Sequence, residues 1–103
     1  MEQREIERID YINSRMNNDY ESIMKIMGEY HNRLLENKND PLLTEALLYF
    51  GEIAQKMLDT QIACNDLLCS DRKYAENTIG RLEDKKIALT NALQYDYEMG
   101  KSR

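Results

Sequence analysis

Two cysteines and one histidine are the residues of this chain best suited to metal binding or nucleophilic chemistry. Cys64 and Cys69 lie five residues apart, which on a helix places their thiols on different faces, so a local disulfide is not expected. A zinc site needs three or four Cys or His ligands at short spacings, and this chain does not supply them. We expect Cys64 to be a small buried apolar residue, His31 to have a packing or surface role, and no metal to be bound.

Motifs for other chemistry are also missing from the sequence. It contains no Gly-rich phosphate loop, no nucleophile elbow and no HExxH pair. Glu2 and Glu5 form its only ExxE pair, a spacing that can hold magnesium, but they lie at a terminus where a helix frays. We therefore expect no catalytic residue, no cofactor and no enzymatic activity.

The charge balance argues against two classes of partner. The chain carries 14 Lys and Arg against 19 Asp and Glu, a net charge of -5, and no basic cluster is longer than a pair. Nucleic-acid binders usually present a basic stripe to the phosphates, so direct nucleic-acid binding is not expected. No run approaches the roughly 20 apolar residues of a membrane span, and the start, MEQREIERID, is too charged for a signal peptide. We expect a cytoplasmic protein without membrane contact.

The composition favours one all-α domain over residues 1–103. The chain has no Val and no Trp, one Pro and four Gly, so it offers little for strands and hairpins. Its richness in Asn, Ile, Lys and Tyr is typical of AT-rich genomes, such as those of bacteriophages and low-GC bacteria. The expected fold is an antiparallel three-helix bundle or a long helical hairpin, with coiled-coil packing.

An apolar seam marks the first helix, expected over residues 3–37. Its a and d positions recur every seven residues, with Asn13 as the polar member. Asn at an a position can fix the register of a coiled coil, or can simply lie near a solvated end of the bundle. We expect this seam to form a homodimer through Ile9, Asn13, Met16, Tyr20, Ile23, Met27 and Tyr30.

The second and third helices are expected over residues 41–69 and 72–99. Asp40 is suited to the N-cap and Pro41 to the first helical position. Ser70 and Asp71 are good N-caps, which favours a turn near residues 69–72. No Gly or Pro enforces that turn, so one continuous helix of nearly sixty residues is the alternative.

The second helix has more apolar surface than its seam accounts for. Leu47, Leu48, Tyr49 and Phe50 follow one another, and consecutive helical residues point about 100° apart. The third segment is lean by comparison, because its inward series includes Lys86. We therefore expect Leu48, Tyr49 and Ile62 to form a second surface that binds another protein. The alternative is a central helix buried on nearly all sides.

These features lead to three hypotheses for function. The first is a non-catalytic protein-interaction module, such as a phage-encoded inhibitor or modulator acting on a host protein in the host cytoplasm. The second is a self-associating structural or assembly component, with a chaperone-like role in a larger complex. The third is an acidic mimic of nucleic acid, because an acidic row recurs every seven residues at Glu45, Glu52, Asp59 and Asp66.

Overall fold

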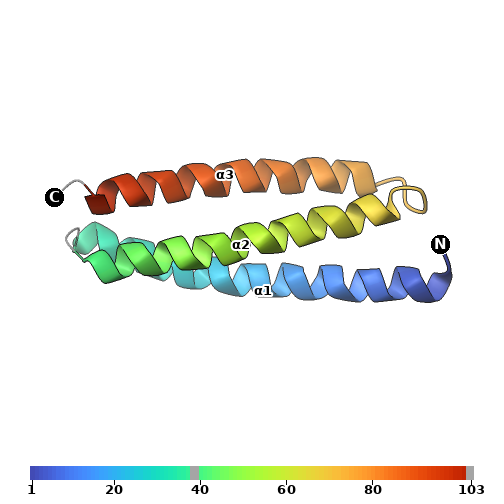
Figure 1. The fold of residues 1–103 in the computed structure, drawn as a ribbon, viewed down its shortest axis with the longest axis horizontal. Coiled ribbons are helices and arrows are strands. Elements are labelled where there is room, and N and C mark those ends of the chain that lie inside the picture. The colour runs from blue at the N-terminus through green and yellow to red at the C-terminus, as the bar shows by residue number, and fades with distance from the viewer. Residues whose placement is uncertain (38–39, 102–103) are drawn as a thin grey trace.

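Three antiparallel helices make up the protein. A computed structural model describes residues 1–37 and 40–101, with side chains described as far as Glu98. The helices are α1 (Gln3–Glu36), α2 (Pro41–Leu68) and α3 (Ala75–Lys101), and they form a rod of 54 × 19 × 14 Å (Figure 1). No strand occurs in the described ranges. The prediction of an all-α three-helix bundle is confirmed.

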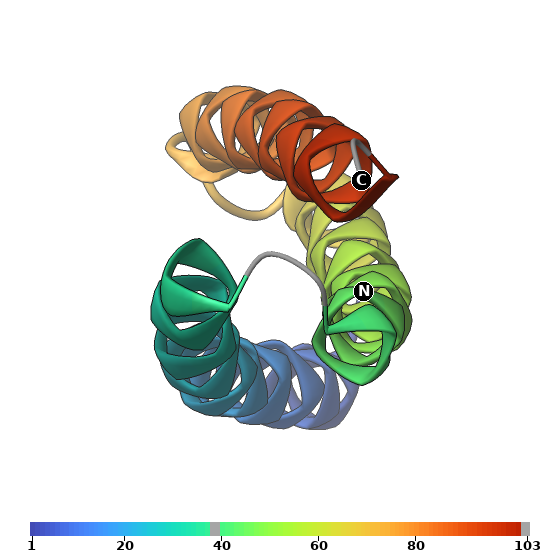
Figure 2. The ribbon, with the colours of Figure 1, turned by 90° about the vertical axis from the view of Figure 1, so that its left-hand side faces the viewer.

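The central position of α2 determines the shape of the molecule. It packs along both α1 and α3, whereas those two helices contact each other only weakly. Figure 2 shows the resulting arc, with α1 and α3 on two sides of α2. One side of the rod is a groove lined by residues of α1 and α3, and the opposite side is the back of α2.

The start of α2 follows from two adjacent residues. The carboxylate of Asp40 accepts hydrogen bonds from the backbone N–H groups of Leu42 and Leu43, at 3.0 and 3.3 Å, and Pro41 occupies the first helical position. An N-cap aspartate satisfies amide groups that have no partner within the helix, and proline there loses no hydrogen bond.

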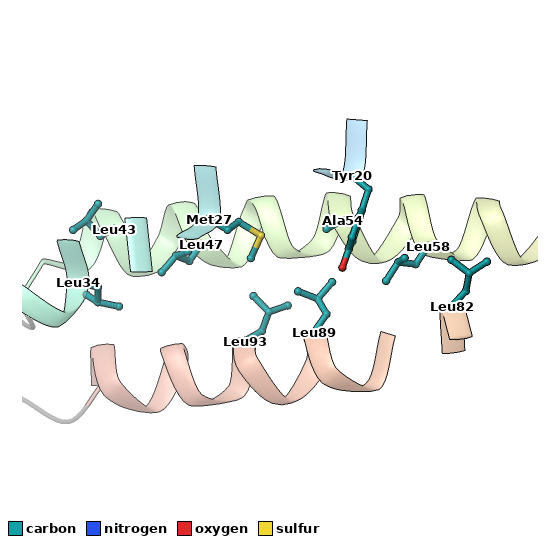
Figure 3. Packing of buried hydrophobic residues seen from close by; sticks show 10 residues of the cluster. All are labelled: Tyr20, Met27, Leu34, Leu43, Leu47, Ala54, Leu58, Leu82, Leu89 and Leu93. Atoms are coloured by element: carbon teal, nitrogen blue, oxygen red, sulfur yellow. The ribbon is translucent and has the colours of Figure 1, made fainter. Parts of the chain in front are cut away.

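The core is a line of apolar side chains contributed by all three helices. Figure 3 shows these side chains pointing toward one another from α1, α2 and α3. The buried cluster consists of Tyr20, Met27, Leu34, Leu43, Leu47, Ala54, Leu58, Leu82, Leu89 and Leu93. The spacing of seven residues within each helix keeps one stripe facing inward over its whole length.

A short connection separates α2 from α3, so the chain does not form one continuous helix. The N–H groups of Asp71 and Arg72 both bond to the carbonyl of Leu68, at 3.0 and 2.9 Å, which closes the last turn of α2. The guanidinium of Arg72 then forms a two-pronged ion pair with Asp10 of α1. This pair joins the connection to the first helix.

Candidate functional site

The back of α2 carries a second apolar stripe, which we call the outer seam. Its positions alternate at spacings of four and three residues, the pattern that packs one helix against another. The outer seam consists of Leu42, Ala46, Tyr49, Ile53, Lys56, Thr60, Ala63 and Leu67. Its large apolar side chains are exposed by 74% at Leu42, 58% at Tyr49, 44% at Ile53 and 55% at Leu67. Within the described chain, this stripe lies opposite the core and has no helix packed over it.

An acidic row runs along one edge of the outer seam. Glu45, Glu52, Asp59 and Asp66 are all exposed and recur every seven residues. Asp59 forms an ion pair with Lys86 of α3 at 2.6 Å, which locates this edge on the α3 side of α2. A helix that packed on the outer seam would therefore meet negative charge along this flank.

Tyr49 is the aromatic residue of the outer seam, and its hydroxyl is held in place. It donates a hydrogen bond of 2.8 Å to the carboxylate of Glu45, one turn earlier. That hydrogen bond, together with the negative charge of Glu45, raises the pKa of Tyr49. The phenol consequently stays protonated at neutral pH, with its ring across the seam and its polar end in the acidic row.

The apolar surface extends from α2 onto α1. The rings of Tyr30 and Phe50 meet at 5.9 Å between centroids and join the two helices there. Ile26 lies one turn before Tyr30, and Ile53 lies one turn after Phe50. Because α1 and α2 are antiparallel, one turn back along α1 and one turn forward along α2 lead toward the same end of the rod. The exposed side chains of Ile26 and Ile53 therefore both lie on that side of the contact between Tyr30 and Phe50. The outer seam therefore borders further apolar surface on α1.

The three residues predicted to bind a partner have different surroundings. Tyr49 is exposed, Leu48 is half-buried, and Ile62 is half-buried and packed against the core cluster. Tyr49 and Ile62 are thirteen residues apart, which places them on nearly opposite sides of a helix. The structure therefore groups Tyr49 with Leu42, Ile53 and Leu67, residues that were not selected from the sequence. Their alternating spacing was the signal available to find them.

The residues predicted to form the homodimer lie within the fold of a single chain. Tyr20 and Met27 are buried in the core, and the remaining five, Ile9, Asn13, Met16, Ile23 and Tyr30, are half-buried. Self-association through this seam stays a prediction. Because the seam faces α2, a second copy could use it only by replacing α2.

His31 has a partner within the fold, whereas Cys64 and Cys69 are free thiols. Nδ1 of His31 lies 2.6 Å from Oδ1 of Asp96, which joins α1 to α3. Both cysteines are free, and burial raises the pKa of Cys64. The pKa of Cys69 is also raised, first by burial and then by Asp66 and Glu76. Since the thiolate is the nucleophile and the metal ligand, both thiols are poorly suited to either role.

A polar layer crosses the bundle between α1 and α2. The Nδ2 of Asn65 donates to the backbone carbonyl of Gln61 at 2.8 Å and to Oδ1 of Asn13 at 3.5 Å. Asn13 therefore has a partner inside its own chain. This contact occurs where heptad spacing alone would place apolar side chains.

Neither a candidate metal site nor a helix able to span a membrane occurs among the described residues. The described residues contain no group of three or more His, Cys, Asp or Glu side chains that could hold a metal ion. No helix among them combines the length and the hydropathy needed to cross a bilayer. No family model, no curated protein and no solved structure matches the chain.

Proposed function

We propose that this protein is a non-catalytic interaction module that binds an amphipathic helix of another protein along the outer seam of α2. The observation that supports it best is the exposure of Leu42, Tyr49, Ile53 and Leu67 at helix-packing spacing. Helix-in-groove recognition uses apolar anchors at this spacing. Aromatic residues that become buried when a partner binds, as Tyr49 would, commonly carry most of the binding energy of an interface.

The charge of the flank indicates what kind of helix fits. The acidic row favours a partner with Lys or Arg beside its apolar seam. A second copy packed antiparallel on the same seam would place its acidic row against Glu45, Glu52 and Asp66, which is unfavourable. The occupant we propose is therefore a basic amphipathic helix from a different protein.

The biological setting belongs to the same proposal. The chain is rich in Asn, Ile, Lys and Tyr, which is typical of proteins encoded by AT-rich genomes such as those of bacteriophages. This composition fits a phage-encoded inhibitor or modulator that acts on a host protein in the host cytoplasm. An assembly role is the alternative, with self-association through the α1 seam. Light scattering at high protein concentration tests that alternative, which requires a mass above that of a monomer.

Designed peptides can test the outer seam before the natural partner is identified. One helical peptide would carry a Leu and Ile seam with Lys on its flank, and a matched peptide would carry Glu on the flank. We expect saturable binding of the Lys peptide alone, measured by fluorescence anisotropy. Equal binding of both peptides, or of neither, would contradict the proposal.

Two matched variants locate the binding. The first double variant, Tyr49→Ser with Ile53→Ser, alters the outer seam. The control double variant, Tyr95→Ser with Ile87→Ser, removes a tyrosine and an isoleucine from α3, where their side chains are exposed by 58% and 61%. Loss of a single aromatic anchor typically costs about 2 kcal/mol or more, or roughly thirtyfold in affinity. We expect this loss only in the α2 variant, with unchanged helix content in both. Affinity purification with the two double variants as bait would then identify the partner. It is the protein that the α3 variant retains and the α2 variant does not.

A further inference from the structure

The groove between α1 and α3 contains a polar cavity of about 660 Å³. It lies on the side of the rod opposite the outer seam, where the arc of helices is open (Figure 2). Polar side chains from all three helices line most of it, including Asn13, Asn17, Gln61, Thr78, Arg81 and Lys85. Its volume is in the range of small-molecule sites in proteins.

The charge of this cavity is opposite to that of the whole molecule. Arg81 and Lys85 lie one turn apart on α3 and both line the cavity, but no carboxylate does. Neither cation forms an ion pair with a described residue. The Nζ of Lys85 lies 5.4 Å from the ring centroid of Tyr20 on α1, so its stem crosses the groove. In a chain of net charge -5, this is a local positive site.

Gln61 forms the floor of the cavity. Its residue is only 5% exposed; its backbone carbonyl accepts from Asn65, and its side-chain amide makes no hydrogen bond to any described residue. No fully buried side-chain nitrogen or oxygen among the described residues lacks a hydrogen-bond partner, so the amide of Gln61 is open to the cavity that it lines. Beside it, Oδ1 of Asn13 accepts from Asn65, while its Nδ2 bonds to no described residue. The floor and one wall therefore present amide groups that a ligand could satisfy.

We propose that this cavity binds a small polar anion that carries a carboxylate or a phosphate group. Arg81 and Lys85 hold the oxyanion by charge-assisted hydrogen bonds. The amides of Gln61 and Asn13 bond to the polar remainder of the ligand. The site is independent of the outer seam, because it lies on the opposite side of α2 and shares no residue with it.

Titration with two simple probes tests the site. Inorganic phosphate and citrate would be added separately to the ¹⁵N-labelled full chain, and amide shifts followed by NMR. We expect saturable shifts for the side-chain NH2 groups of Gln61 and Asn13 with at least one probe. Saturation by phosphate alone assigns a phosphate ligand, by citrate alone a carboxylate ligand, and by both an oxyanion of either kind. No saturable shift with either probe would overturn the proposal.

Charge-matched variants separate a built site from diffuse attraction. Arg81→Gln with Lys85→Gln removes both cations of the cavity, while Lys25→Gln with Lys73→Gln removes two exposed lysines outside it. We expect the dissociation constant to rise about tenfold or more in the first variant and to stay within about twofold in the second. An equal loss in both variants would overturn the proposal.

A third variant tests the floor without changing charge. Gln61→Met keeps a similar side-chain length but removes the amide. We expect weaker binding of the same probe, with helix content unchanged by circular dichroism. If this variant bound the probe as tightly as the wild-type protein does, the amide floor would have no role and the proposal would fail.

Discussion

The two ends of the bundle contain different interiors. Toward the connection between α1 and α2, the apolar half is filled by Leu34, Leu43, Leu47 and Leu93 (Figure 3). Toward the connection between α2 and α3, the polar half contains Asn13, Gln61 and Asn65.

The two halves also differ in the side-chain partners of their buried polar residues. Asp96 in the apolar half is buried but lies 2.6 Å from His31, whereas the side-chain amide of Gln61 in the polar half makes no hydrogen bond to a described residue. Both halves bury leucines, because Leu58 and Leu68, toward the connection between α2 and α3, are also fully buried. The two halves therefore differ in the polar groups that they contain and in the partners of those groups.

The largest expected effect is the loss of a core leucine from the apolar half. Leu47 is fully buried, so Leu47→Ala should lower the free energy of unfolding by about 2–5 kcal/mol, since it leaves a cavity. Leu42→Ala, on the exposed back of the same helix, should change it by less than about 0.5 kcal/mol. Urea unfolding measures both. Similar losses in the two variants would mean that the core is not where the structure places it.

Replacing one glycine in each half by alanine should have opposite effects on stability. A Cβ on Gly51 would overlap the side chain of Leu93, whereas one on Gly80 would have nothing within 4 Å. Gly51→Ala should therefore cost about 1–3 kcal/mol through overpacking. Gly80→Ala should add about 0.5–1 kcal/mol, because alanine loses less entropy in a helix. Thermal melts that moved in the same direction would show that α3 does not approach α2 closely at Gly51.

Gln61 and Asn65 allow the polar half to be tested by two substitutions with opposite expected effects on stability. Gln61→Met should leave the free energy of unfolding unchanged or raise it by up to about 1 kcal/mol, since the side-chain amide makes no hydrogen bond to a described residue that the substitution would break. Asn65→Leu should lower it by about 1 kcal/mol, because the bonds to Asn13 and to the Gln61 carbonyl are lost. Opposite signs are the expected result in urea unfolding. A clear loss of stability in Gln61→Met would indicate that the amide has a structural partner.

The smallest effect concerns Tyr20, which lies between the two halves. Burial, followed by the charge of Glu21, raises its pKa above 10.0. A folded-state pKa above the unfolded value gives stability that is complete below about pH 10 and lost as the pH rises further. Tyr20→Phe keeps the ring next to Lys85 and removes the titrating hydroxyl, so it should lose less stability between pH 9 and 11. If the stability of the variant and of the wild-type protein fell equally between pH 9 and 11, the raised pKa of Tyr20 would be contradicted.

Local chemistry in the sequence was sufficient to predict much of the fold. Asp40 defines the start of α2 because its carboxylate accepts from two backbone amides, and Pro41 occupies the first helical position. The spacing of Tyr20, Met27 and Leu34 marks the inward face of α1. The third helix begins at Ala75, where the sequence suggested a start near residue 72. Ser70 and Asp71 are good N-cap residues, but here they lie in the connection that closes onto Leu68.

The candidate site was harder to predict because α2 carries overlapping apolar stripes. Leu48 and Tyr49 are adjacent in sequence, yet the side of α2 that faces α3 decides which of them is covered. That choice depends on how the third helix crosses the second, which no local pattern specifies. The free amide of Gln61 depends likewise on the separation of α1 from α3.

The weak contact between α1 and α3 also has a consequence for folding. Each of these helices packs on the helix next to it in sequence, so most contacts are local, which favours rapid folding. We expect each terminal helix to detach locally while the hairpin formed by the other two persists, because α1 and α3 contact each other only weakly and are joined by few pairs such as His31 with Asp96. Backbone amides of α2 should consequently exchange with deuterium more slowly than those of either neighbour, since α2 belongs to both hairpins.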